Sequence, residues 1–318
     1  MNTLVNFLHA ALLAGTPLMF GTLGEITTER AGNLNLGVEG MMSIGAIAGF
    51  YVGFVTENIV LAVLGAFLAG LLSALVYAFL TVTLKANQNV TGLTLTIFGV
   101  GFANFFGDFL RESSGVSVLK LSEQITHSVQ EIHIPVLSDL PYAGKLFFQY
   151  NPFVYFGILL CIIMGIYIFH TRAGLNLCAV GENPGAADAA GIAVTRVKYI
   201  NILLGGGICG IGGAYISLVL CGGVWVTDCV NGLGWIAVAL VIFASWNPFK
   251  AVFGSFIFGA FNILKFYIPK NIISIPEAIF DMLPFLVTAL VLIVTSIRKS
   301  KENAQPAGCG VNYFREER

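Results

Sequence analysis

The side chains that could do chemistry are few in this chain and lie far apart. It contains no G-x-x-x-x-G-K-[ST] loop to cradle nucleotide phosphates, and no H-E-x-x-H or G-x-S-x-G motif. The histidines are scattered (His9, His127, His133 and His170), and the six cysteines form no C-x-x-C pair or zinc spacing. We therefore expect no catalytic residues, no metal site and no cofactor in the chain itself.

Ionisable residues beside apolar stretches are the second chemical signal. Glu39, Asp108, Asp228 and Lys265 all lie near the ends of runs without charge. A charge at the bilayer centre costs about 2.5–3.5 kcal/mol on insertion scales, so one that is buried there usually has a function. For Asp108 and Lys265, a position at the end of a run favours an interfacial side chain that reaches water. Ion-coupled secondary transport through Glu39 and Asp108 stays an alternative interpretation.

Composition excludes a soluble protein. Of 318 residues, 57% are hydrophobic and 10% are charged, and the mean hydropathy is +0.85. A soluble domain carries about 25% charged residues, because its surface must be hydrated. Most of this exterior must therefore face hydrocarbon. The net charge of −1 gives no reason to expect a nucleic-acid partner.

Stretches without Asp, Glu, Lys or Arg predict the membrane helices. We expect an all-α, polytopic bundle of about nine spans, with eight to ten acceptable, because a span needs about 20 apolar residues. The runs are 1–24, 40–56, 58–84, 86–107, 146–171, 199–227, 229–249, 251–264 and 282–297.

The distribution of basic residues predicts which side of the membrane each connection occupies. With nine spans and an outer N-terminus, eleven of the sixteen Lys and Arg residues fall in inner segments. Inner connections are normally richer in Lys and Arg, so the C-terminus is predicted to be cytoplasmic. Residues 1–298 then form a transmembrane domain with an outer loop at 109–151 and an inner segment at 171–198. Residues 299–318 form a cytoplasmic tail.

In residues 29–42, glycine and polar residues interrupt a hydrophobic region just before the apolar run at 40–56. Three glycines and two asparagines lie within this stretch, which reads ERAGNLNLGVEGMM. Irregular backbone at membrane depth must be buried in protein or line a wet cavity. Asn33, Asn35 and Glu39 therefore either line a polar path or pair with freed backbone groups. Alternatively, the glycines serve only close helix packing.

The inner segment carries the signals of a short helix over 184–190. Asn183 is a good N-cap and Pro184 a favoured first residue. Asp188 suits the start of the helix and Gly191 its end. The helix would be about 10 Å long, with a surface of alanine and glycine and little to hold it to a core. Such a helix suits a groove in another protein; a linker helix at the membrane interface is the alternative.

At this point the chain resembles a known family. Residues 29–42 and 181–192, together with 231–235 and 243–248, resemble signature stretches of bacterial ABC-importer permeases. That group serves ribose, other simple sugars, branched-chain amino acids and nucleosides. The resemblance is greatest to the shorter of the two paralogous nucleoside-type subunits. Residues 109–151 resemble nothing that we can name.

The resemblance implies the partners. It implies a permease with inverted-repeat halves in the bacterial cell membrane, paired with a longer paralogue. A separate cytoplasmic ATPase would use ATP and Mg²⁺, and an extracytoplasmic substrate-binding lipoprotein would deliver the solute.

The resemblance also implies a site. Residues around the 184–190 helix would form the coupling helix that docks on the ATPase. Relatives usually carry basic residues where this chain has Asn176 and Cys178. Either electrostatic docking is weaker here, or it relies on Arg172, Arg196 and Lys198. The implied docking residues are Gly181, Glu182, Asn183, Pro184, Ala186, Ala187, Asp188, Ala190 and Gly191.

A path without strong internal charge suits a neutral solute. We expect a nucleoside, with simple sugars or branched-chain amino acids as alternatives for the same class of permease. Polar and aromatic residues are the candidates to line the path. They are Asn35, Glu39, Thr91, Thr94, Asn104, Asn231 and Trp235.

Overall fold

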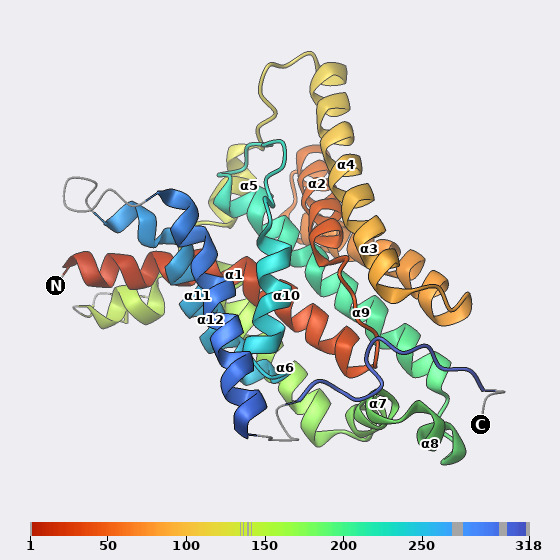
Figure 1. The fold of residues 1–318 in the computed structure, drawn as a ribbon. Coiled ribbons are helices and arrows are strands. Elements are labelled where there is room, and N and C mark those ends of the chain that lie inside the picture. The colour runs from red at the N-terminus through yellow and green to blue at the C-terminus, as the bar shows by residue number, and fades with distance from the viewer. Residues whose placement is uncertain are drawn as a thin grey trace.

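The computed structural model is a helical bundle (Figure 1). It describes residues 2–133, 135, 137, 138, 140, 142–268, 276–298 and 304–315. Among these residues, seven helices are long and apolar enough to cross a membrane. They are α1 (Asn2–Arg30), α2 (Val38–Thr56), α3 (Ile59–Ala78, extended by η1, Phe79–Thr83), α4 (Gln88–Ser114), α6 (Pro152–His170), α9 (Val194–Tyr215, extended by η3, Ile216–Leu220) and α11 (Pro248–Tyr267).

Two further apolar helices complete the bundle, so each of the nine predicted runs overlaps a helix. They are α10 (Leu233–Phe243) and α12 (Glu277–Arg298). The prediction of a full span over 229–249 is wrong. At 1.5 Å per residue, the 11 residues of α10 extend about 16 Å, roughly half of a hydrocarbon core. The described part of the chain does not include Pro141 of the predicted outer loop, Lys270 between the last two predicted spans, or Lys299, Lys301 and Arg318 of the predicted tail.

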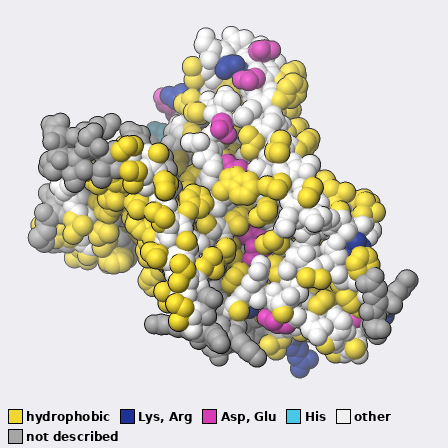
Figure 2. All heavy atoms as spheres, viewed as in Figure 1, with side chains coloured by type: hydrophobic (Ala, Val, Ile, Leu, Met, Phe, Trp, Pro, Cys, Tyr) yellow, Lys and Arg dark blue, Asp and Glu magenta, His cyan; other side chains and the backbone are white. Residues whose placement is uncertain are grey.

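Short helices lie at the two ends of the bundle. At one end are α7 (Arg172–Glu182) and α8 (Pro184–Ala189); at the other is α5 (Glu123–Ser128) (Figure 1). Hydrophobic side chains cover much of the visible flank between these ends (Figure 2). This distribution agrees with a protein whose sides face lipid.

Helix α9 is the centre of the bundle and packs against α1, α2 and α3. Its glycines let the neighbouring backbones approach closely, as small residues do between membrane helices. A Cβ atom on Gly213 would overlap the carbonyl oxygen of Met42 in α2. The Ser217 hydroxyl donates to the Ala46 carbonyl (2.9 Å), and the Tyr215 hydroxyl donates to the Leu13 carbonyl (3.0 Å). Helix α9 thus joins α1 and α2 through both packing and hydrogen bonds.

The last turn of α1 holds the connection between α10 and α11. The Trp246 indole N–H donates to the Glu29 carboxylate, and the Arg30 guanidinium donates twice to the Trp246 carbonyl (3.1 and 3.2 Å). Ser245 and Trp246 both have positive φ, at 52° and 54°. This costly backbone conformation is stabilised here by side chains from a helix more than 200 residues earlier in the chain.

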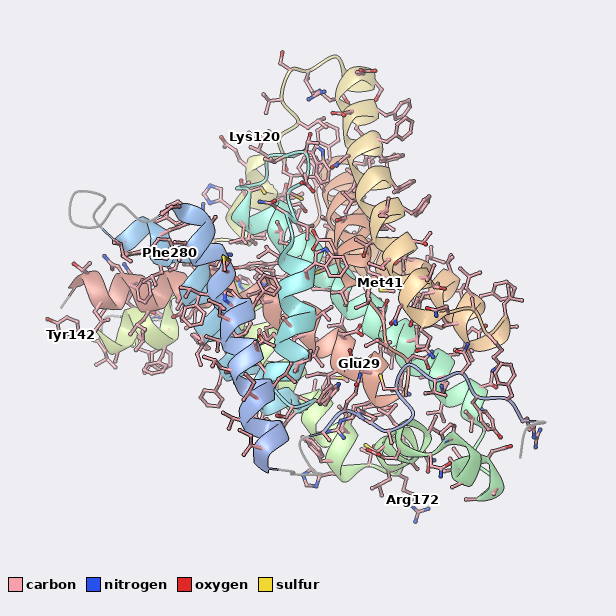
Figure 3. The ribbon with its side chains drawn as sticks, in the orientation of Figure 1. Glu29, Met41, Lys120, Tyr142, Arg172 and Phe280 are labelled. Carbon is pink, nitrogen blue, oxygen red and sulfur yellow. The ribbon has the colours of Figure 1, made fainter. Side chains whose placement is uncertain are left out.

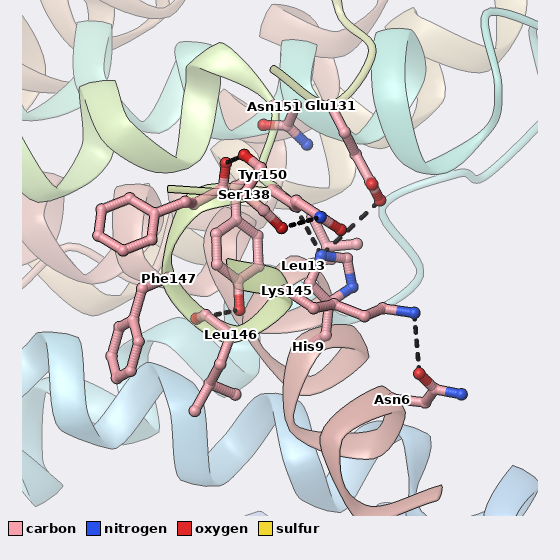
Figure 4. Close-up of polar contacts among 12 residues, drawn as sticks. Asn6, His9, Leu13, Glu131, Ser138, Lys145, Leu146, Phe147, Tyr150 and Asn151 are labelled. Carbon is pink, nitrogen blue, oxygen red and sulfur yellow. Dashed lines mark hydrogen bonds and ion pairs between the residues drawn. The ribbon is translucent and has the colours of Figure 1, made fainter. Parts of the chain in front are cut away.

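The 109–151 loop is anchored to the N-terminal end of α1 (Figure 4). Lys145 Nζ donates to the Asn6 side chain (2.8 Å), and His9 Nε2 lies 2.7 Å from the Gln149 carbonyl oxygen and 3.7 Å from the Glu131 carboxylate. The same loop also binds the α9–α10 connection through a β-bridge between Lys120 and Val224.

The packing of α9 against α2 predicts the effect of Gly213→Val. The added side chain should force the two helices apart and lower the free energy of unfolding by at least about 2 kcal/mol, as overpacking does. We expect a clear drop in the thermal midpoint of the chain purified in detergent. Gly101→Ala is the control, because a Cβ atom there meets nothing within 4 Å. Equal stability of the two variants would contradict the close contact.

Candidate functional site

The short helix predicted in the inner segment is present as α8. The Asn183 side chain accepts a hydrogen bond from the Ala186 backbone N–H (2.9 Å), and Pro184 is the first residue of α8. Gly191 ends the segment in the left-handed conformation, at φ +84°. The structure thus confirms the cap, the start and the turn after α8, although the helix ends at Ala189 instead of residue 190.

The expectation that α8 has little to hold it is wrong. Ala187 is 4% exposed and packs with Val180 of α7 and Val194 of α9. Ala186 and Ala190 are exposed. Helix α8 therefore has one face that is fixed to the bundle and another that is free to meet a partner.

Residues on both sides of α8 tie it to the rest of the chain. A Cβ atom on Gly181 would overlap the Arg30 carbonyl, so α7 ends directly against α1. The Glu182 carboxylate accepts from the Ala307 backbone N–H (3.3 Å). The Asp188 carboxylate accepts from the Tyr313 hydroxyl (2.7 Å). The polar groups near α8 thus take part in contacts within the chain.

The basic residues near α8 divide into exposed and buried ones. Arg172 and Arg196 are exposed, and Arg172 points away from the bundle (Figure 3). Lys198 is only 4% exposed, so its side chain does not lie at the surface in this conformation. Cys178 is partly buried: burial raises the pKa of its thiol, and the nearby Arg30 guanidinium opposes that rise.

The interruption between α1 and α2 is non-helical, as predicted, and largely buried. The Glu25 carboxylate accepts from the backbone N–H (3.0 Å) and the side-chain amide (3.1 Å) of Asn35. The Asn35 side-chain oxygen accepts in turn from the Gly37 N–H (2.9 Å). Asn33 is buried, and its side-chain amide has no hydrogen-bond partner among the described residues. Of the two interpretations of Asn35, the pairing with freed backbone groups is the one seen here.

Glu39 caps a helix that is distant in the sequence. Its carboxylate accepts from the backbone N–H groups of Gly232 (2.7 Å) and Gly234 (2.6 Å) at the start of α10. Helix α10 has no side-chain cap of its own, and the positive end of its dipole favours an anion there. A Cβ atom on Gly234 would overlap the Glu39 backbone, so the two helix ends meet directly.

Asn231 and Trp235, two of the predicted path residues, line a cavity of about 490 Å³ beside this junction. Asn262 and Lys265 of α11 also line it. Amides, an indole ring and the Lys265 ammonium group give the cavity hydrogen-bonding groups, a flat apolar face and one cation, which suits a ring-shaped solute that carries polar groups.

The other path candidates lie elsewhere and do not join this cavity. The hydroxyl of Thr91 donates to the Asn87 carbonyl, and that of Thr94 donates to the Val90 carbonyl (both 2.8 Å). The Asn104 side-chain oxygen accepts from the Asp228 backbone N–H (2.9 Å). In this conformation these side chains bond within α4 or to the α9–α10 connection.

Sequence reasoning missed Glu25 and the pairing of Glu29 with Trp246. Both acids are fully or almost fully buried in α1. Their spacing of four residues, at the end of an apolar stretch and on one helix face, was the available signal. The partners lie on other elements, so the spacing alone did not identify them.

Comparison with known proteins gives the chain's relatives. A family profile described as "Branched-chain amino acid transport system / permease component" matches residues 7–292. TsgC13 of Haloferax volcanii, provisionally described as a glucose ABC transporter permease, is 37% identical, over 83% of this chain and 78% of its own length. The nucleoside ABC transporter permease NupC of Lactococcus lactis is 33% identical over 99% and 98%, respectively. The guanosine ABC transporter permease NupQ of Bacillus subtilis is 31% identical over 89% of each.

The profile covers most of the chain, including α8 and the residues that line the cavity. The three permeases match this chain over most of their own length. Together with the seven apolar helices, these matches define a multi-pass membrane protein. The chain belongs to the ABC transporter permease family described as branched-chain amino acid transport system permease component.

Proposed function

We propose that this chain is one permease subunit of an ATP-driven importer of nucleosides. The match with NupC, which extends over almost the full length of both chains, is the observation that carries the proposal. Residues 1–298 would form the permease domain in the cell membrane, with α8 and residues 299–318 on the cytoplasmic side. The chain would pair with a second, longer permease subunit and receive its solute from an extracytoplasmic binding lipoprotein.

Glucose and other simple sugars are a second candidate, which the 37% identity to TsgC13 favours. Nucleosides and sugars share a hydroxylated ring, so side-chain amides such as those of Asn231 and Asn262 suit both. Trp235 offers a face on which a nucleobase can stack. A nucleoside would use both kinds of group, whereas a sugar would use mainly the amides.

Coupling would pass through the exposed face of α8. A separate ATPase that binds ATP and Mg²⁺ would contact Ala186 and Ala190. When α8 moves with the ATPase, the buried contacts of Ala187 would transmit that movement to α7 and α9. Helices would then rearrange so that the path opens alternately to each side of the membrane. The permease would form or break no covalent bond; it would supply the coupling free energy between two conformations.

Reconstitution of the complete transporter tests the function. Nucleoside uptake into proteoliposomes should require ATP, the ATPase and the binding protein, and the purified chain alone should show neither uptake nor ATP hydrolysis. Unlabelled glucose and leucine serve as competitors that distinguish the alternative solutes. Uptake by the chain alone under a proton gradient would contradict the proposal and favour a secondary transporter.

The exposed face of α8 is tested by Ala186→Arg. A bulky cation there should lower both ATPase co-purification and uptake at least tenfold, while the thermal midpoint stays unchanged because residue 186 is exposed. Ala173→Arg, at an exposed position at the start of α7, is the matched control. Normal coupled uptake by the Ala186→Arg variant would mean that α8 is only a linker.

The junction between α2 and α10 is tested by Glu39→Ala. Two N–H groups at the start of α10 would lose their acceptor, at a cost of about 1–3 kcal/mol for each buried group. We expect a lower thermal midpoint by tryptophan fluorescence, and a smaller loss for Glu39→Gln, which keeps one acceptor oxygen. If Glu39→Ala is as stable as the unchanged chain, Glu39 does not cap α10.

A further inference from the structure

Residues 304–315, which we call the strap, lie at the same end of the bundle as α7 and α8 (Figure 1). The Gly308 backbone N–H donates to the Gly181 carbonyl (2.8 Å). A Cβ atom on Gly308 would lie only 2.7 Å from that oxygen, so the two backbones meet closely. Burial raises the pKa of the Cys309 thiol, and the nearby Glu29 raises it further. A Cβ atom on Gly32, just after α1, would lie 3.4 Å from the Gly308 carbonyl oxygen, so the strap passes beside the end of α1 as well as the end of α7.

Asn312 of the strap binds the connection between α3 and α4. Its side-chain amide donates to the carbonyls of Lys85 (2.6 Å) and Ala86 (3.2 Å), and its oxygen accepts from the Gln88 side chain (3.1 Å). Gln88 also accepts from the Leu34 backbone N–H (2.7 Å), in the interruption between α1 and α2. Asn312 thus begins a chain of hydrogen bonds that leads to the interruption between α1 and α2.

The next residue of the strap binds α8. The Tyr313 hydroxyl donates to the Asp188 carboxylate (2.7 Å), and Arg315 Nε lies 3.2 Å from the same oxygen. Tyr313 also packs against the cluster of Val180, Ala187 and Val194. Two adjacent side chains of the strap therefore bind two different elements, α8 and the α3–α4 connection.

We propose that the strap is a mechanical link that transmits movement of α8 to the α3–α4 connection and to Leu34. The proposal rests on the docking of α8 to an ATPase. Networks of hydrogen bonds can carry energetic coupling between separate sites, and the strap joins α8 to the α3–α4 connection through such a network. Asn312 and Tyr313 are then positioning residues for transport, although neither contacts the solute.

The link between the two ends of the strap is tested first without the ATPase. Tyr313→Phe removes only the hydroxyl that binds α8 and leaves Asn312 intact. Hydrogen exchange of the purified chain should become at least threefold faster at the backbone amides of residues 85–90. Val311→Ala, on the same segment with a side chain that is 61% exposed, is the control and should change nothing. Unchanged exchange at 85–90 in the Tyr313→Phe chain overturns the proposal, whatever the function of the protein.

The effect on transport is tested in the complete transporter with the Asn312→Ala and Tyr313→Phe double variant. The ATPase should co-purify as before and hydrolyse ATP within twofold of the normal rate, while nucleoside uptake per ATP falls at least fivefold. An unchanged ratio overturns the proposal. Parallel loss of co-purification, hydrolysis and uptake also overturns it, because the strap would then serve docking or folding alone. Failure of the ATPase to bind the unchanged chain contradicts the proposed function instead.

Discussion

The structure depends on how backbone polar groups are satisfied where a helix is interrupted inside the bundle. Hydrocarbon offers no hydrogen bonds, so the groups freed at such a break need partners from the protein. Glu39 supplies two acceptor oxygens to the start of α10, and Asn35 binds both Glu25 and Gly37. The sequence suggested that Glu39 and Asn35 line a solute path. In this conformation they instead bind the backbone groups that are left free where the helices are interrupted.

The two candidate regions share this dependence, since both adjoin an interruption. The 490 Å³ cavity lies at the start of α10, beside Gly232, and α8 follows the point where α7 ends against Arg30. The last turn of α1 contacts both the α10–α11 connection and the end of α7. It therefore joins these two connections at one end of the bundle.

The features predicted correctly from the sequence have local causes. The cap at Asn183 and the turn at Gly191 depend on neighbours within a few residues, and an apolar run predicts a helix wherever it occurs. The burial of Ala187 was missed because Tyr313, part of its covering cluster, lies more than 120 residues later. The length of α10 was also missed, since residues 229–232 before it carry no charge and yet lie in a loop, where the Gly232 N–H binds Glu39.

The position of the strap in the chain has a consequence for biosynthesis. A ribosome makes Asp188 and Gly181 before α9 to α12, but their partners at Tyr313 and Gly308 follow all of these helices. The contacts that join α7 and α8 to the strap therefore form only after α9 to α12 have been synthesised. A nascent chain that has been made only as far as α12 therefore lacks the hydrogen bonds that Tyr313 and Gly308 donate.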